Sequence, residues 1–151
     1  MELRRFYQEV LNGHNSSPGY KGTLSDATAA LEGVNPSCGD DIVLQLKIED
    51  GRIADGRFEG NGCAVSQASA DIMLDLVIGK TEEEARRLAG LFIDMVQGKA
   101  SEEILEELEE AAAFQDIAHM PARVKCAVLG WRTLTEMLKP NPGQPSERIS
   151  I

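Results

Sequence analysis

The sequence has no long apolar run and no cluster of basic residues. No apolar stretch approaches the roughly 18 residues of a transmembrane helix, and Met1–Phe6 lacks the apolar stretch of a signal peptide. The formal net charge is −10, so phosphate backbones and anionic membranes would be repelled. We therefore expect a cytoplasmic protein that binds neither nucleic acid nor membrane.

Cysteine and histidine are both scarce, which limits the available chemistry. The three cysteines are an odd number, and thiols stay reduced in the cytoplasm, so a disulfide-held scaffold is excluded. Burial, metal binding or catalysis are left to explain them. The two histidines, His14 and His119, lie outside the segments that carry the cysteines, and we do not expect them to be ligands.

Alternating apolar residues predict a small antiparallel sheet. Ile42–Ile48 places apolar side chains on one face at period two, and Asp50-Gly51 then supplies a tight-turn dipeptide before a second strand, Arg52–Phe58. Ala27–Val34 could form an earlier strand, although its alanines suit a helix equally well.

Apolar residues at helical spacing predict five helices. The first, Leu3–Leu11, should end at Asn12-Gly13, and residues 14–22 should form a loop. The other four run from Cys63 to Gly79, from the Thr81 cap to Gly98, over Glu102–Ala113, and from Pro121 to Lys139. This order predicts an α+β fold with the helices packed on one face of the sheet. Residues 1–139 should form a single domain, and residues 140–151, which are rich in proline, should form a flexible C-terminal tail.

Each cysteine is predicted to lie near a junction between elements. Cys38 precedes a strand, Cys63 separates a strand from a helix, and Cys126 lies early in the last helix. All three could meet at one end of the sheet. Tetrahedral zinc needs a fourth donor, and Asp40 is the candidate because only Gly39 separates it from Cys38.

Simpler interpretations of these residues remain open. Asp40 could be a turn aspartate that bonds its own backbone, and each cysteine could be a small buried hydrophobic residue. Arg123 and Lys125 flank Cys126 and could stabilise anionic sulfur electrostatically, or could lie on an ordinary solvated helix face.

Three segments together resemble the signature segments of the IscU/SufU family. They are Asn35–Asp40, Gly60–Ser69 and Pro121–Trp131. The resemblance covers the chain as far as Lys139. It implies a SufE/NifU-like α+β fold whose metal ligands match Cys38, Asp40, Cys63 and Cys126 here.

Two features favour the SufU branch of this family. Lys125 stands where IscU scaffold members typically carry a histidine ligand, and the stretch between Cys63 and Cys126 contains the extra helical material of SufU-type proteins. The resemblance then implies a zinc-dependent protein that takes persulfide sulfur from a cysteine desulfurase of the SufS type. Cys38, on a loop, would accept the sulfur and pass it to downstream iron-sulfur assembly proteins. Such a protein is a sulfurtransferase-like relay rather than an enzyme that turns over a small molecule.

Two other functions remain as alternatives. The same residues could form a scaffold that assembles and hands on a [2Fe-2S] cluster, with iron bound transiently. In a second alternative, a closed four-ligand zinc site would be purely structural, within an interaction module.

Overall fold

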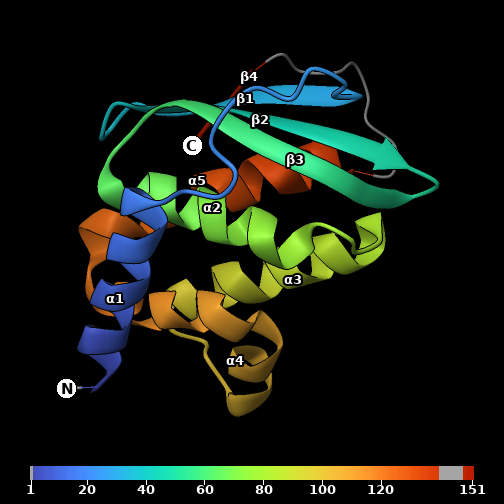
Figure 1. Ribbon diagram of the computed structural model, residues 1–151. Coiled ribbons are helices and arrows are strands. Elements are labelled where there is room, and N and C mark those ends of the chain that lie inside the picture. The colour runs from blue at the N-terminus through green and yellow to red at the C-terminus, as the bar shows by residue number, and fades with distance from the viewer. Residues whose placement is uncertain (1, 140–147) are drawn as a thin grey trace.

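The computed structural model describes residues 2–139 and 148–151, which form one four-stranded sheet with the helices on one of its faces (Figure 1). The elements in chain order are α1 (Glu2–Ser16), β1 (Ala29–Asn35), β2 (Asp40–Glu49), β3 (Arg52–Asn61), α2 (Ala64–Val77), α3 (Glu82–Val96), α4 (Glu102–Leu108), the 3-10 helix η1 (Glu109–His119), α5 (Pro121–Met137) and β4 (Arg148–Ser150). The predicted α+β class is confirmed. None of the helices in the described residues has the length and apolar character that a membrane span requires.

The sheet has the strand order β3-β2-β1-β4, and its first three strands are antiparallel as predicted. Asp50 and Gly51 both have positive φ, 52° and 74°, which is the backbone of the tight turn expected between β2 and β3. The ambiguous segment before β2 is a strand, β1, and its register places Asn35 opposite Asp40. The apolar side chains of β2 that point towards the helices, Ile42, Leu44 and Leu46, are fully buried.

The last residues of the stretch predicted to be a flexible tail form β4, which pairs with β1 in parallel. The Ile151 N–H donates to the Val34 carbonyl at 3.0 Å, and Arg148 forms an ion pair with Glu32 at 2.9 Å. The edge of β1 would otherwise present unpaired backbone groups, and this short strand satisfies some of them. Residues 140–147, the rest of that tail, lie outside the described residues.

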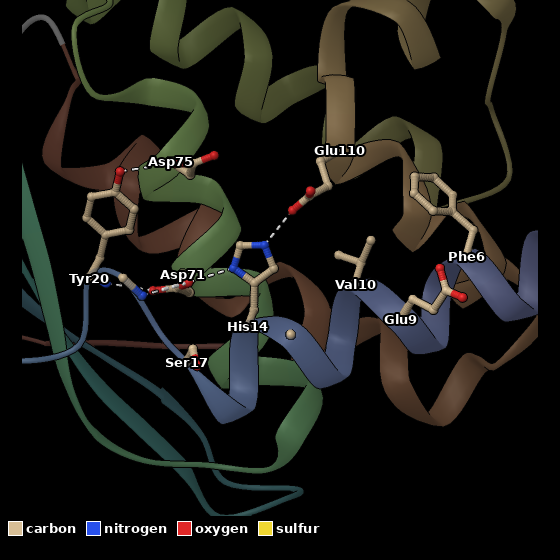
Figure 2. Close-up of a pocket in the computed structure, with 11 residues that line it drawn as sticks. Phe6, Glu9, Val10, His14, Ser17, Tyr20, Asp71, Asp75 and Glu110 are labelled. Atoms are coloured by element: carbon tan, nitrogen blue, oxygen red, sulfur yellow. Dashed lines mark hydrogen bonds and ion pairs between the residues drawn. The ribbon is translucent and has the colours of Figure 1, made fainter.

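Helix α1 continues to Ser16, beyond the end predicted at Asn12-Gly13. Side chains of its last turn form bonds to distant parts of the chain. His14 bonds Asp71 of α2 through Nδ1 and Glu110 of η1 through Nε2, at 2.6 and 2.5 Å (Figure 2). Asn15 Nδ2 donates to the Ala64 carbonyl at 3.0 Å. These tertiary bonds outweigh the weak local preference of an Asn-Gly pair for a helix end.

The helices α2 and α3 agree with prediction, whereas the next predicted helix divides in two. Thr81 caps α3 by accepting from the Glu84 N–H at 3.1 Å, and Ser101 caps α4 in the same way. Helix α4 stops at Leu108 because Glu109 adopts φ 53°, and the chain continues as the 3-10 helix η1. Ala111, Ala113 and Phe114 of η1 are buried, so this departure keeps apolar residues in the core.

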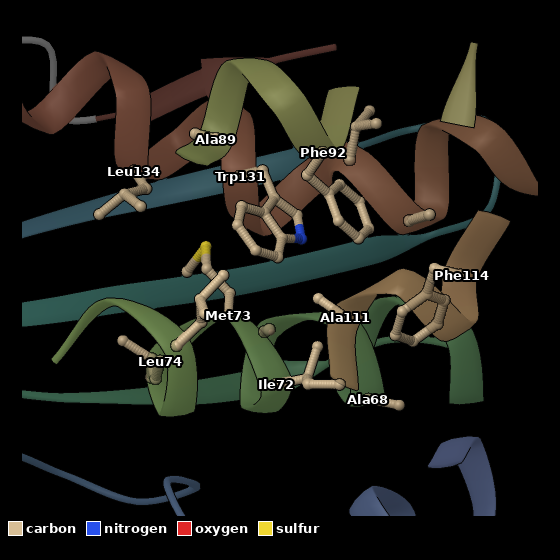
Figure 3. Close-up of a cluster of buried hydrophobic side chains, with 14 of the residues drawn as sticks. Ala68, Ile72, Met73, Leu74, Ala89, Phe92, Ala111, Phe114, Trp131 and Leu134 are labelled. Atoms are coloured by element: carbon tan, nitrogen blue, oxygen red, sulfur yellow. The ribbon is translucent and has the colours of Figure 1, made fainter. Parts of the chain in front are cut away.

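The core lies between the helices and extends to the sheet (Figure 3). Phe92 of α3 stacks on Trp131 of α5 with ring centroids 4.1 Å apart, and Phe114 packs edge-on against Phe92. The Trp131 indole N–H donates to Ser69 Oγ at 2.9 Å, and Ser69 Oγ donates to the Ala127 carbonyl at 2.6 Å. These buried bonds join α2, which begins beside Cys63, to α5, which contains Cys126.

Candidate metal centre

The predicted ligands come from four elements or junctions that meet at one end of the sheet. Cys38 lies in the turn between β1 and β2, and Asp40 begins β2. Cys63 is the residue before α2, and Cys126 lies in the second turn of α5. Figure 1 shows the β1–β2 turn and the β3–α2 junction at the same end of the molecule.

Three of these residues form a compact group of donors. The sulfur atoms of Cys38 and Cys126 lie 3.3 Å apart, and one ligand atom each from Cys38, Asp40 and Cys126 lies within 4.8 Å of the others. Two sulfurs bound to one tetrahedral zinc, each at about 2.3 Å, would lie about 3.8 Å apart. The observed spacing therefore needs only a small adjustment to bind one ion.

The three donors differ in their access to solvent. Cys38 is exposed, whereas Asp40 and Cys126 are fully buried. A partner molecule can therefore approach the group from the side of Cys38. The buried carboxylate and thiol form the inner wall.

Asp40 accepts hydrogen bonds from other segments rather than from its own turn. Its Oδ1 accepts from the Cys63 backbone N–H at 2.9 Å and lies 3.2 Å from Ser66 Oγ. Its Oδ2 accepts from Asn35 Nδ2 at 3.1 Å. The turn-aspartate interpretation therefore does not describe this residue. These bonds give both oxygens of the buried carboxylate a partner.

Cys63 belongs to the same site but lies outside the compact group. Its sulfur caps α2, accepting from the Ser66 N–H at 3.5 Å. Its own backbone N–H binds Asp40, so the start of α2 and the start of β2 are joined directly.

The Cys126 thiol is strongly affected by its surroundings. Burial raises its pKa well above the ordinary value, and hydrogen bonds to Cys38 and Cys63 raise it further. A thiol in these surroundings stays protonated at neutral pH unless a positive charge compensates for the lost hydration. A divalent cation supplies such a charge, so the donor set fits a metal that binds thiolates.

Arg123 and Lys125 are both exposed on the first turns of α5. Within the described residues, neither side chain forms a hydrogen bond or ion pair with a cysteine. Burial raises the pKa of the Tyr7 hydroxyl on α1, and the positive charge of Arg123 partly offsets this rise.

Among the described residues, neither histidine belongs to the group of donors that could hold a metal ion. His14 is held between carboxylates in a groove of about 600 Å³ lined by α1, α2 and η1 residues (Figure 2). His119 is exposed at the end of η1.

Sequence reasoning assigned no role to Asn35 or Ser66, and both contact the site. Each is fully buried and bonds Asp40. Ser66 had a detectable signal, because a capping residue and the residue three positions later interact at helix starts. Asn35 had none, because its contact with Asp40 depends on the β1–β2 register.

The fold and this cluster define a class of small α+β proteins with thiols and a carboxylate gathered at one end of the sheet. A family model described as NifU-like N terminal domain matches residues 6–147. The chain belongs to this family, and its relatives are iron-sulfur cluster assembly scaffold and SufU proteins.

Two relatives align over most of the chain. The iron-sulfur cluster assembly scaffold protein IscU of Thermotoga maritima is 43% identical over 139 residues, which cover 92% of this chain and 96% of the relative. The zinc-dependent sulfurtransferase SufU of Bacillus subtilis is 38% identical over 132 residues, which cover 87% and 88%.

A solved structure agrees with the fold. The crystal structure of a putative iron-sulfur cluster assembly scaffold protein for the SUF system from Fervidobacterium islandicum has a TM-score of 0.83 and 36% identity. The match covers 90% of this chain and 98% of that one. The predicted family resemblance is therefore confirmed.

Proposed function

We propose that the protein is a sulfur acceptor of iron-sulfur cluster assembly, with Cys38 as the residue that receives sulfur. One observation carries this proposal. Cys38 is the exposed member of a group in which its sulfur lies 3.3 Å from the buried sulfur of Cys126. An acceptor thiol must be accessible, and among the described cysteines Cys38 best meets that requirement.

Zinc is the metal that we assign to this site, held by Cys38, Asp40, Cys63 and Cys126. Three thiols and one carboxylate are a suitable donor set for tetrahedral zinc. Zinc would supply positive charge that keeps the bound sulfurs deprotonated without redox chemistry of its own. Cys63 joins the set because its backbone N–H bonds Asp40 and its sulfur contacts Ser66, whose hydroxyl also lies against Asp40.

The sulfur donor that we propose is the persulfide of a cysteine desulfurase of the SufS type. The Cys38 thiolate attacks the terminal sulfur of that persulfide, and a new S–S bond forms at Cys38. The S–S bond of the desulfurase breaks, and its electron pair leaves with the desulfurase cysteine as a thiolate. The exchange consumes no oxidant or reductant.

A downstream iron-sulfur assembly protein would then take the sulfur from Cys38. Free thiols of this kind persist in a reducing compartment, so we assign the reaction to the cytoplasm. Arg123 and Lys125 would favour the anionic persulfide electrostatically, because both are exposed cations on the helix that holds Cys126.

The substitution Cys38→Ser tests this assignment. We expect the variant to fold and to lose sulfur acceptance, because a serine hydroxyl is a far weaker nucleophile than a thiolate at neutral pH. The measurement is the mass of the protein after incubation with a cysteine desulfurase and cysteine. A variant that still gains persulfide sulfur at the wild-type rate would contradict the role of Cys38.

The second candidate is a scaffold for a [2Fe-2S] cluster, favoured by the 43% identity to a protein named as a scaffold. Lys125 weighs against it, because lysine is not a cluster ligand. Addition of iron and sulfide under anaerobic conditions separates the two. A scaffold gains a coloured cluster, a sulfur acceptor accelerates desulfuration of cysteine, and a purely structural zinc module does neither.

A further inference from the structure

Asn35 is the last residue of β1, and its amide group lies against the candidate metal centre. The side chain is fully buried. Its Nδ2 donates to Asp40 Oδ2 at 3.1 Å and to Cys126 Sγ at 3.8 Å. A single amide nitrogen thus contacts two of the residues that we assign to the metal.

The other end of the same amide has no partner. Asn35 Oδ1 is one of two buried side-chain polar atoms in the described residues that lack a hydrogen bond, the other being Asp116 Oδ2. Turning the amide over would place Oδ1 against the Asp40 carboxylate, so two acceptors would then face each other. The observed orientation therefore directs the N–H groups of Asn35 at Asp40 and Cys126 and leaves Oδ1 unpaired.

The unpaired Oδ1 costs stability, and the same amide pairs the buried Asp40 Oδ2 through Nδ2. A leucine at position 35 would remove the first cost but would leave Asp40 Oδ2 without that donor. Local violations of this kind are expected where a residue serves a functional site.

The contacts also show what Asn35 does to Asp40. Oδ1 of Asp40 has two donors within reach, the Cys63 N–H and the Ser66 hydroxyl, whereas Oδ2 has Asn35. Asn35 therefore fixes the rotation of the carboxylate. Because one nitrogen bonds both Oδ2 and Cys126 Sγ, it also holds these two atoms near the same point.

We propose that Asn35 is a positioning residue of the metal centre, which sets the affinity and the ligand geometry for a divalent cation without binding the cation itself. The proposal rests on the proposed zinc site. Residues that orient metal ligands through hydrogen bonds typically change metal affinity by about 10-fold to 100-fold when they are replaced.

The test is Asn35→Leu, with Zn²⁺ and Co²⁺ as probes. We expect the zinc affinity, measured by competition with a chelator, to fall by about 10-fold to 100-fold. The Co²⁺ absorption bands, which report ligand geometry, should shift from those of the wild type. A merely structural role would leave that spectrum unchanged once the protein is folded and loaded.

Thr133→Val is a matched control. Thr133 is fully buried on α5, its hydroxyl donates to the Leu129 carbonyl at 2.8 Å, and it packs against Gly33 of the same strand as Asn35. The control also removes a buried hydrogen bond beside β1 but touches neither Asp40 nor Cys126. Its zinc affinity and Co²⁺ spectrum should match the wild type.

Each outcome decides the proposal. Zinc affinity of Asn35→Leu within about twofold of the wild type, with an unchanged Co²⁺ spectrum, would overturn it, since a residue that orients ligands is expected to matter more. If Asn35→Leu does not fold, as judged by circular dichroism, Asn35→Ser takes its place, because serine is small and its hydroxyl is too short to reach Asp40. Wild-type protein that binds no zinc and accepts no sulfur would contradict the proposed function itself, which separates the two failures.

Discussion

At the scale of single residues, two glycines next to the site adopt backbone conformations that other residues rarely adopt. Gly39 has φ 73° and lies between Cys38 and Asp40, and Gly60 has φ 122° near the end of β3. The two positions differ in their surroundings. A Cβ at Gly39 would meet nothing within 4 Å, whereas one at Gly60 would lie 2.2 Å from the Asp41 carbonyl oxygen.

This difference predicts unequal effects of alanine. Gly39→Ala should lower the free energy of unfolding by about 1 kcal/mol through backbone strain. Gly60→Ala should lower it by about 3 kcal/mol, because a clash with backbone adds to that strain. Urea unfolding of both variants without metal measures the difference. Equal effects would show that the contact with Asp41 relaxes freely.

The residue types of the site could be predicted from the sequence better than their orientation. The position of each cysteine near a junction between elements is a local property, so their meeting at one end of the sheet was predictable. The hydrogen bonds of Asp40 join β1, β2 and α2, and they depend on how these elements pack. The contact of Asn35 with Asp40 depends on the same packing. The sequence around Asn35 did not indicate it, because an asparagine before a proline usually indicates only a turn.

At the scale of elements, His14 links three helices. Its ring contacts Asp71 of α2 and Glu110 of η1, and Asp71 also accepts from the backbone N–H groups of Gly19 and Tyr20 (Figure 2). Burial lowers the pKa of His14, but the hydrogen bonds to Glu110 and Asp71 outweigh it, so the pKa is raised above its ordinary value. The protonated ring donates to both carboxylates at once.

The raised pKa of His14 predicts stability that depends on pH. A group with a raised folded-state pKa contributes fully below its unfolded value, about pH 6.5, and the contribution is lost as pH rises through the folded-state pKa. Raising the pH from about 6 to about 9 should therefore lower the free energy of unfolding of the wild type. The loss should be about 1 kcal/mol larger than the loss in His14→Gln over the same range. Urea unfolding at both pH values measures this.

The exposed His119 provides a control for that comparison. His119→Gln keeps the His14 contacts, so its stability should follow the wild type across the same range. A His14→Gln profile parallel to the wild type would contradict the role of the ring.

Helix ends that are set by contacts within one turn were predicted correctly, whereas ends that are set by distant contacts were not. The start of α3 was predictable because Thr81 and Glu84 form its cap within a single turn. The end of α1 was not, because the bonds of His14 and Asn15 that extend it reach residues about 50 or more positions away in sequence.

At the scale of the whole molecule, β4 is the feature that no local pattern indicated. A three-residue strand after a proline-rich stretch has no periodicity to detect, and it pairs only because β1 offers an open edge. The sheet order therefore depends on residues separated by more than 100 positions in the chain, as the Arg148–Glu32 ion pair shows. This strand closes the edge of the sheet beside the segment that leads to Asn35 and Cys38.

Substitution of Ile151 tests how much this closure matters. The Ile151 N–H donates to the Val34 carbonyl, and Ile151→Pro removes that donor. We expect the free energy of unfolding to fall by about 1 kcal/mol, the typical contribution of one hydrogen bond. We also expect self-association at high concentration, because the exposed edge of β1 can pair with another copy. Urea unfolding and light scattering measure the two effects.

Arg148→Ala separates the backbone pairing from the ion pair that lies beside it. The side chains of Arg148 and Glu32 are 63% and 24% exposed, and solvent-exposed ion pairs contribute little to stability. Arg148→Ala should therefore remain monomeric and lose little stability, whereas Ile151→Pro should show both effects. If both variants behave as the wild type does, the backbone pairing of β4 does not protect the edge, and the three antiparallel strands with their helices carry the stability of the fold alone.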